Sequence, residues 1–292
     1  MTSSWMLVSG FFFAAAGVFV KLGSQWYDAA ELAFYRSLFS FFAVAAVVIA
    51  RGGGGQLWPG PSIGMHVIRG TMGAVGLLGY FHAMAKLPLA TAQTLNYTSP
   101  LFLAIATTLV MGERFSKLLI AAVLLGFGGI AILLQPSFAS GQEAPALIGL
   151  FSGAFASWAY LAVRSLGRAG EPDWRIVLWF GIVATVLCAA FQLATSTFHP
   201  IRWDNAWPII GVGVTGTLAQ FAMTRAYSAG NTLVSGALSY STIVYATLFT
   251  IVIWDETLSP LAWAGMVIIV ASGLLALYAE KKEDQKEAGF ES

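Results

Sequence analysis

The feature that most constrains this chain is a succession of apolar runs, each long enough to cross a lipid bilayer. A hydrocarbon core of about 30 Å needs roughly 20 helical residues. Ten such runs lie at 5–22, 30–50, 64–85, 88–111, 117–135, 145–165, 174–195, 206–227, 231–254 and 259–279. The alternating segments of a membrane β-barrel are absent from the sequence. The sequence therefore predicts an all-α integral membrane protein with ten transmembrane helices.

The two halves of the chain match at a constant offset of 143 residues. The segment LVSGFFFAAAGVFVK at 7–21 aligns with LFSGAFASWAYLAVR at 150–164. The same offset matches Ala83 with Ala226, Leu95 with Leu238, Tyr97 with Tyr240, Glu113 with Glu256 and Ser116 with Ser259. This regularity indicates duplication of a five-helix unit.

An odd number of helices per unit has a consequence for topology. If the first unit begins at the cytoplasmic face, the second begins at the other face, so the halves become inverted repeats, as in many secondary transporters. We place the first repeat at 1–138, the second at 139–280 and a disordered cytoplasmic tail at 281–292.

Basic residues predict the orientation of the helices. With the N-terminus inside, the cytoplasmic side receives Arg51, Arg69, Arg114, Lys117, Arg164, Arg168, Arg175, Arg225, Lys281, Lys282 and Lys286, and the outside receives Lys21, Arg36, Lys86 and Arg202. This bias favours two cytoplasmic termini. Because no Lys or Arg precedes the first run, we interpret it as a span and not as a signal peptide.

Charge and cysteine content exclude several other classes of protein. The net charge is +1, and no basic patch could follow a nucleic-acid backbone. The single cysteine, Cys188, allows neither a disulfide framework nor a cysteine-based metal site. We expect no metal, cofactor or nucleic-acid partner.

One long segment carries a family resemblance. LPLATAQTLNYTSPLFLAIATTLVMGERFSKLLIAAVLLGFGGIAILL, at 87–134, resembles the drug/metabolite transporter superfamily in its EamA-like branch, and the whole chain is similar to bacterial YddG-type amino-acid and metabolite exporters. The matching positions are Pro88, Ala90, Ala92, Pro100, Gly112, Glu113, Arg114, Gly126 and Gly129. The second repeat departs from this pattern, because Ile243 replaces the proline and WDET replaces MGER. The resemblance implies a transporter of the bacterial inner membrane with two chemically unequal gates.

Arg36 is the most conspicuous charge within an apolar run. An arginine at membrane depth costs at least about 2.5 kcal/mol unless it is paired or hydrated. It either pairs with a carboxylate such as Glu31 or Asp28, or snorkels to the surface, or serves as counter-ion to a substrate carboxylate.

The fourth and ninth runs begin with many hydrogen-bonding groups, which lipid tolerates only where they face other helices or water. Asn96, Ser99 and Pro100 share a helical face, and Pro100 frees the carbonyl of Asn96. Helix packing alone accounts for about half of such positions. The predicted substrate-binding residues are Arg36, Tyr80, His82, Asn96, Tyr97, Ser99, Trp158, Ser239, Tyr240, Thr242 and Tyr245.

Proton coupling and gating depend on a few titratable residues. No Asp or Glu occupies the middle of a run, which favours facilitated diffusion, and His82 is the remaining candidate for a proton relay. Ser116 and Ser259 are placed to cap the helices that follow them. Glu113 and Glu256, with Pro100, are predicted to act in gating or in structure.

These observations favour a secondary transporter over an intramembrane enzyme or a channel. The chain lacks His-Glu-x-x-His and Gly-x-Ser-x-Gly motifs and paired carboxylates at membrane depth, and a channel filter would repeat around the membrane normal. We expect a monomeric exporter of amino acids or similar small metabolites that works by alternating access. The alternative is proton-coupled export of lipophilic cations or of sugar-type metabolites.

Overall fold

The computed structural model describes residues 2–53, 55, 57–58, 60–87, 89–136, 141–255 and 258–290, and every regular element within them is helical. The first half contains α1 (Trp5–Gly23), α2 (Ala29–Ala50), α3 (Ile63–Lys86), α4 (Leu89–Asn96), α5 (Ser99–Met111) and α6 (Lys117–Leu134). The second half contains α7 (Glu143–Arg168), α8 (Asp173–Thr195), α9 (Trp207–Ala229), α10 (Thr232–Ser239), α11 (Ser241–Trp254) and α12 (Pro260–Phe290).

Eight helical segments of the described chain are long and apolar enough to cross a membrane. The two predicted spans that fall outside this group are α3 and α9. Both have the length of a span, but their hydropathy is lowered by glycines and by polar side chains such as Arg69 and Gln220. These polar side chains are buried against other helices. A helix enclosed by protein can carry polar groups that lipid would exclude.

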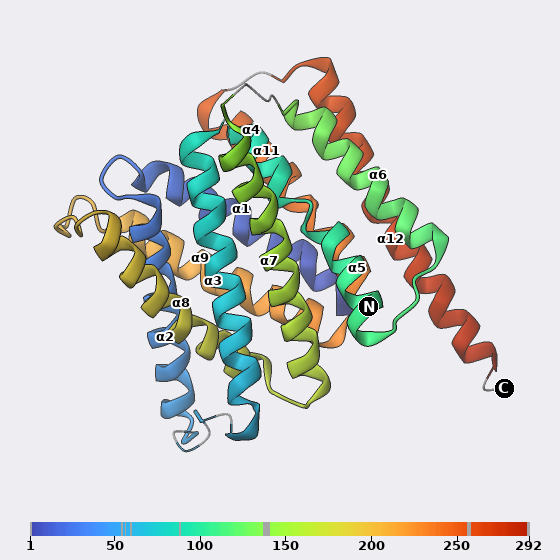
Figure 1. The fold of residues 1–292 in the computed structure, drawn as a ribbon, viewed down its shortest axis with the longest axis horizontal. Helices are drawn as coiled ribbons and strands as arrows, with labels where there is room; N and C mark the ends of the chain where they lie inside the picture. Colours follow the sequence, from blue (N-terminus) through green and yellow to red (C-terminus); the bar gives the residue numbers. More distant parts are fainter. Residues whose placement is uncertain are drawn as a thin grey trace.

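The helices pack as a bundle in which segments distant in sequence lie side by side (Figure 1). The closest packing joins α3 to α7, α6 to α12, α1 to α9 and α2 to α8. The α6–α12 pair forms one edge of the bundle (Figure 1). The helices approach most closely there at Gly129 and Gly265, since a Cβ added to Gly265 would lie 2.8 Å from the carbonyl oxygen of Gly129.

Tryptophan side chains are exposed at both ends of the bundle. At the end where α1 begins, the N-terminal end, Trp5 is 48% exposed and Trp58 is 65% exposed. At the opposite end, Trp203 and Trp263 are 99% and 49% exposed. Two girdles of this kind are typical of a membrane protein, because tryptophan favours the interface between hydrocarbon and water.

The fourth and ninth predicted spans are each divided into two helices. The run 88–111 becomes α4 and α5, which separate at Tyr97 and Thr98, and the run 231–254 becomes α10 and α11, which separate at Tyr240. Pro100 lies in the first turn of α5, where its missing N–H costs nothing. The second break occurs without a proline. The two tyrosines at these breaks differ by the same 143 positions as the sequence repeat.

Helix ends follow the sequence prediction in part. Ser116 caps α6 by accepting a hydrogen bond from the Leu119 amide, and Ser259 accepts one from the Ala262 amide in α12. Gly112, after α5, and Asp255, after α11, both adopt the left-handed conformation, with φ of 67° and 52°. The structure differs from the predicted tail, because α12 continues to Phe290.

Candidate functional site

Arg36 extends from α2 into the interior of the bundle. Its guanidinium carbon lies 5.7 Å from the centre of the Phe13 ring on α1. Its aliphatic stem packs on α9 at Gly216, where an added Cβ would come within 2.9 Å of the Arg36 Cγ and Cδ atoms. The residue is half-buried, and its side chain lies between α1 and α9.

Arg69 enters the same interior from α3. Its side chain is 3% exposed, and its Nη2 donates a hydrogen bond of 3.2 Å to Oε1 of Gln220 on α9. The guanidinium carbon stacks 3.8 Å from the centre of the Phe180 ring, an arrangement that favours a cation. The Nε atom is buried without a partner in the described structure. Arg69 is therefore fixed in position but not neutralised.

Among the described residues, neither arginine has a carboxylate within ion-pair distance. The structure contradicts the predicted pairing of Arg36 with Glu31, because the Glu31 carboxylate binds His199 instead. A buried charge without a counter-ion carries a large desolvation penalty. The interior of this conformation is therefore electropositive around the two arginines.

Tyrosine side chains line the space around the two guanidiniums. Tyr160 on α7 lies within electrostatic reach of both Arg36 and Arg69, and its ring stacks on that of Tyr227 with centroids 4.6 Å apart and an interplanar angle of 13°. Tyr97 lies beside Tyr160. The space therefore combines aromatic walls with positive charge.

Two neutral hydrogen-bond pairs complete this lining. The hydroxyl of Tyr80 is within hydrogen-bonding reach of Gln93, and that of Tyr97 is within reach of Thr242. Tyr80 and Tyr97 lie deep in the bundle but keep accessible surface. Three predicted residues besides Arg36 are thus brought together here: Tyr80, Tyr97 and Thr242.

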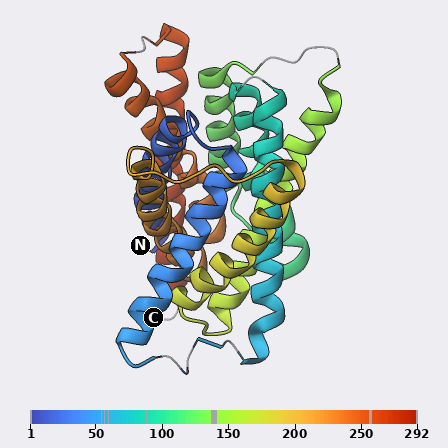
Figure 2. The same cartoon turned by 90° about the vertical axis from the view of Figure 1, so that its left-hand side faces the viewer.

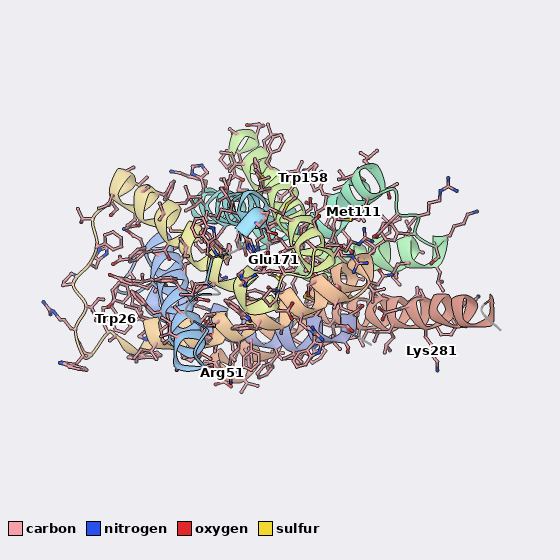
Figure 3. All side chains as sticks on the ribbon, turned by 90° about the horizontal axis from the view of Figure 1, so that it is seen from below. Trp26, Arg51, Met111, Trp158, Glu171 and Lys281 are labelled. Carbon is pink, nitrogen blue, oxygen red and sulfur yellow. The ribbon has the colours of Figure 1, made fainter. Side chains whose placement is uncertain are left out.

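Other predicted residues lie away from this interior. His82 is exposed on the outside of α3, and Trp158 is 47% exposed near the periphery of the bundle (Figure 3). Tyr245 packs edge-on against Phe11 of α1, with ring centroids 5.8 Å apart. The exposed position of His82 removes it from reach of a substrate held between the arginines.

Among the polar residues of the broken helices, some connect two helices and others bond within their own helix. The Asn96 amide donates to Ser152 on α7 at 3.0 Å, and the Ser239 hydroxyl donates to the Gly236 carbonyl. Ser99, Pro100 and Tyr240 are buried, with Pro100 against Gly236 and the Tyr240 ring 6.3 Å from that of Tyr97. Glu256 lies outside the described residues.

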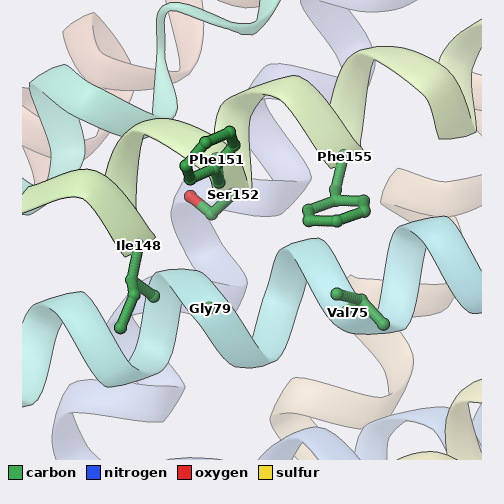
Figure 4. Close-up of a pocket in the computed structure, with 6 residues that line it drawn as sticks. All are labelled: Val75, Gly79, Ile148, Phe151, Ser152 and Phe155. Carbon is green, nitrogen blue, oxygen red and sulfur yellow. The ribbon is translucent and has the colours of Figure 1, made fainter. Parts of the chain in front are cut away.

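A groove of about 390 Å³ lies between α3 and α7 (Figure 4). It is lined by Val75, Gly79, Ile148, Phe151, Ser152 and Phe155. Phe151 is 58% exposed, and nearly all of the lining is apolar. The groove is therefore suited to contact with lipid chains and not to a polar substrate.

Ion pairs connect the two halves of the chain at the N-terminal end. Glu113, after α5, pairs with both Arg164 and Arg168 on α7, and its distance to Arg164 Nη2 is 3.8 Å. Arg164 also donates to the Gly230 carbonyl at 2.8 Å. At the opposite end, Lys21, the repeat equivalent of Arg164, lies 3.9 Å from the centre of the Trp254 ring.

A second polar cluster lies at the opposite end, where the segment between α8 and α9 runs across the start of α2 (Figure 2). The fully buried Glu31 carboxylate accepts hydrogen bonds from the His199 amide, at 2.9 Å, and from its ring Nδ1, at 2.8 Å. Possible metal-ligand atoms of Asp28, Glu31 and His199 lie within 4.8 Å of one another. Because His199 occupies both oxygens of Glu31, this cluster is a link between segments.

The sequence analysis missed Arg69, Tyr160 and Gln220. Arg69 was counted as a cytoplasmic charge because it lies near the start of its run. The signal that could have identified it is Gly73, one turn later, where an added Cβ would lie 2.6 Å from the Arg69 Nη1 atom. A glycine one helical turn after an arginine in an apolar run indicates that the helix leaves room for the guanidinium.

We predict that Arg36→Met stabilises the protein without substrate. The substitution removes an unpaired interior charge that costs at least about 2.5 kcal/mol in a membrane, which corresponds to a rise in Tm of several degrees. Thermal unfolding of purified protein measures the effect, with Arg51→Met, at the exposed residue directly after the same helix, as a neutral control. A fall in Tm would show that Arg36 has a stabilising partner.

We also predict a pH-dependent contribution from His199. The hydrogen bond with Glu31 raises the pKa of His199 above its ordinary value, with a further contribution from the charge of Asp28, and desolvation opposes these effects. A histidine whose pKa is higher in the folded than in the unfolded protein stabilises the fold when it is protonated. This contribution is complete below the unfolded-state pKa, about 6.5, and is lost as pH rises through the folded-state pKa.

The difference in Tm between wild type and His199→Gln should therefore be larger at pH 6 than at pH 9. A difference that is equal at both values would mean that the link does not depend on the imidazolium charge.

Comparison with known proteins gives this chain clear relatives. The EamA-like transporter family matches residues 1–135 and 144–278. A pseudopaline exporter of Pseudomonas aeruginosa is 31% identical over 94% of this chain and 95% of its own length. A riboflavin transporter of Rhizobium johnstonii is 24% identical over 97% and 93%, and an S-adenosylmethionine uptake transporter of Rickettsia bellii is 23% identical over 97% and 95%.

A solved structure shows the same fold. One crystal structure with 20% sequence identity superposes with a TM-score of 0.83, covering 96% of this chain and 99% of the other. The family match covers most of the chain in two successive segments, and the relatives named above are transporters. This multi-pass membrane protein thus belongs to the EamA-like transporter family, within the drug/metabolite transporter superfamily.

Proposed function

We propose that this protein is a secondary transporter of the bacterial inner membrane that exports carboxylate-bearing metabolites, such as amino acids and their derivatives. The observation that carries the proposal is the pair Arg36 and Arg69, which lie in one interior without a carboxylate partner among the described residues. A substrate carboxylate can accept two hydrogen bonds from a guanidinium and supply the missing charge.

The same electrostatics argue against the alternative of a lipophilic cation. A cation in this interior would be repelled by two guanidiniums, and no described carboxylate at the site would offset the repulsion. The similarity to a pseudopaline exporter supports transport of a metabolite and export as the direction. Small organic anions and zwitterions therefore fit the site better than cationic drugs.

We propose alternating access between two inverted repeats, at 1–138 and 139–280. The helix breaks at Tyr97 and Tyr240 support this arrangement, since they are equivalent in the repeat. The packing of α1 on α9 is matched by that of α7 on α3, as an exchange of the two halves requires. Broken helices near the centre of a membrane are a common feature of transporter substrate sites.

Both termini are placed in the cytoplasm in this proposal. When the interior residues Arg36 and Arg69 are left out of the basic residues counted above, ten remain on the cytoplasmic side and three on the outside, so the bias persists. The N-terminal end of the bundle is then cytoplasmic. The contact of Glu113 with Arg164 and Arg168 becomes a cytoplasmic gate, closed in this conformation.

Facilitated diffusion is the proposed mode of transport. His82, the titratable residue predicted for a proton relay, is exposed on the bundle surface. The described neighbours of Arg36 include Phe13, Tyr160 and Cys188, and none of them is a carboxylate. The substrate then moves down its own gradient, and protons need not be carried in return.

Counterflow uptake of labelled amino acids by purified protein in liposomes tests this function. We expect saturable exchange of at least one amino acid that a pH gradient does not drive. Arg36→Gln and Arg69→Gln should each lower exchange at least about tenfold, because a charged hydrogen bond contributes roughly 1.5–3 kcal/mol.

The surface variant Arg51→Gln is the matched control and should exchange like wild type. Uptake of a lipophilic cation in place of any amino acid, with both arginine variants active, would contradict the proposal.

A further inference from the structure

We infer that the preferred substrate carries two carboxylate groups, one bound by Arg36 and the other by Arg69. This inference rests on the proposed function and narrows its substrate class. It depends on the number of positive charges in the interior, on the way each is held and on the absence of acidic partners among the described residues around them.

Charge balance is the first argument. Arg36 contacts Gly216 and Arg69 binds Gln220, one turn further along α9, so the two charges lie close enough to repel each other. The neutral Tyr160 lies within electrostatic reach of both. A zwitterion with a single carboxylate can pair with only one of the two guanidiniums and leaves the other without an anion. A dicarboxylate brings a charge for each guanidinium, and the gain is large because the surroundings are poorly hydrated.

The unequal support of the two guanidiniums is the second argument. Arg69 is fixed by the hydrogen bond to Gln220 and by the Phe180 ring, and its Nε remains without a partner. Arg36 makes contact with Phe13 and the backbone at Gly216, and no described residue accepts a hydrogen bond from it. Arg69 thus offers a rigid subsite and Arg36 an adjustable one.

The rest of the lining is suited to an organic skeleton with polar substituents. Tyr80 and Tyr97 present hydroxyls beside Gln93 and Thr242, and these groups can accept hydrogen bonds from a substrate ammonium. Aromatic faces around them also favour a cation. An acidic amino acid, with two carboxylates and one ammonium, matches every element of this lining.

A phosphate monoester also carries two negative charges, but on a single group. It would neutralise both arginines only if their guanidiniums converged on one point. Because Arg69 is held by Gln220 on α9 and by the Phe180 ring on α8, whereas Arg36 leans on Phe13 of α1, two separate carboxylates are the better match.

The test is counterflow in liposomes with substrates that differ in one charged group. Labelled glutamate is compared with glutamine, which has the same skeleton and an amide in place of one carboxylate, and with glutarate and glycerol phosphate. We expect glutamate and glutarate to exchange at least about tenfold better than glutamine, the loss that follows from one missing charged contact.

Arginine variants then assign the contacts. In Arg36→Gln the ratio of glutamate to glutamine exchange should fall by about tenfold, since the second carboxylate loses its partner. Arg36→Lys, which keeps the charge, should retain much of the wild-type ratio, and Arg51→Gln should keep all of it. A ratio is informative even if a variant is produced in smaller amounts, because both substrates are measured on the same sample.

The outcomes separate this inference from the function on which it rests. Glutamine exchange equal to that of glutamate would overturn the inference and leave amino-acid transport intact. Exchange of glycerol phosphate in preference to glutamate and glutamine would also overturn the inference, because the preferred substrate would then carry one phosphate group and not two carboxylates. No exchange of any amino acid or organic acid would overturn the proposed function itself.

Discussion

Two guanidiniums, on Arg36 and Arg69, lie within a membrane bundle, and the described side chains around them are neutral. Many features of the fold accommodate them. Gly216 and Gly73 leave room for the arginine side chains, and Gln220 and Phe180 hold Arg69 in place. Gly73 lies on α3, and Gly216 and Gln220 lie on α9. These two helices are less apolar than the other predicted spans, and neighbouring helices enclose their polar residues. Because no described carboxylate pairs with these charges, we propose that an anion binds there.

Several acidic residues lie at the ends of the bundle and bind basic residues there. Glu113 pairs with Arg164 and Arg168 at one end, and Glu31 binds His199 at the other. Because these carboxylates lie at the ends and not beside Arg36 and Arg69, they join segments of the chain and leave the interior positive. Helix breaks at Tyr97 and Tyr240 supply points where the two halves can change shape around the site. The proposed cycle therefore needs only exchange of contacts at the ends while the charged centre stays fixed.

The sequence predicted the all-helical, membrane-spanning class because bilayer thickness sets the length of each apolar run. The inverted repeat, which appears as a constant offset, stays a prediction. It did not predict the helix break at Tyr240, where no proline occurs. Arg69 was missed because a charge near the end of a run resembles a loop charge. His82 and Trp158 were expected in the interior, but a helix that is apolar on all sides gives no indication of which face meets lipid. Arg36, Tyr80, Tyr97 and Thr242 were predicted because polar groups inside apolar runs are rare. The structure places them in the interior, and their contact with a substrate stays a prediction.

Nuclear magnetic resonance of guanidinium-labelled arginine in the purified protein tests the central claim most directly. Signals of Arg36 and Arg69 are assigned by their loss in Arg36→Lys and Arg69→Lys, and glutamate is then titrated against glutamine. The account predicts saturable shifts of both signals with glutamate, a smaller response to glutamine and no response of the exposed Arg51. Unchanged Arg36 and Arg69 signals at glutamate concentrations that saturate exchange would contradict it, because the substrate would then bind elsewhere.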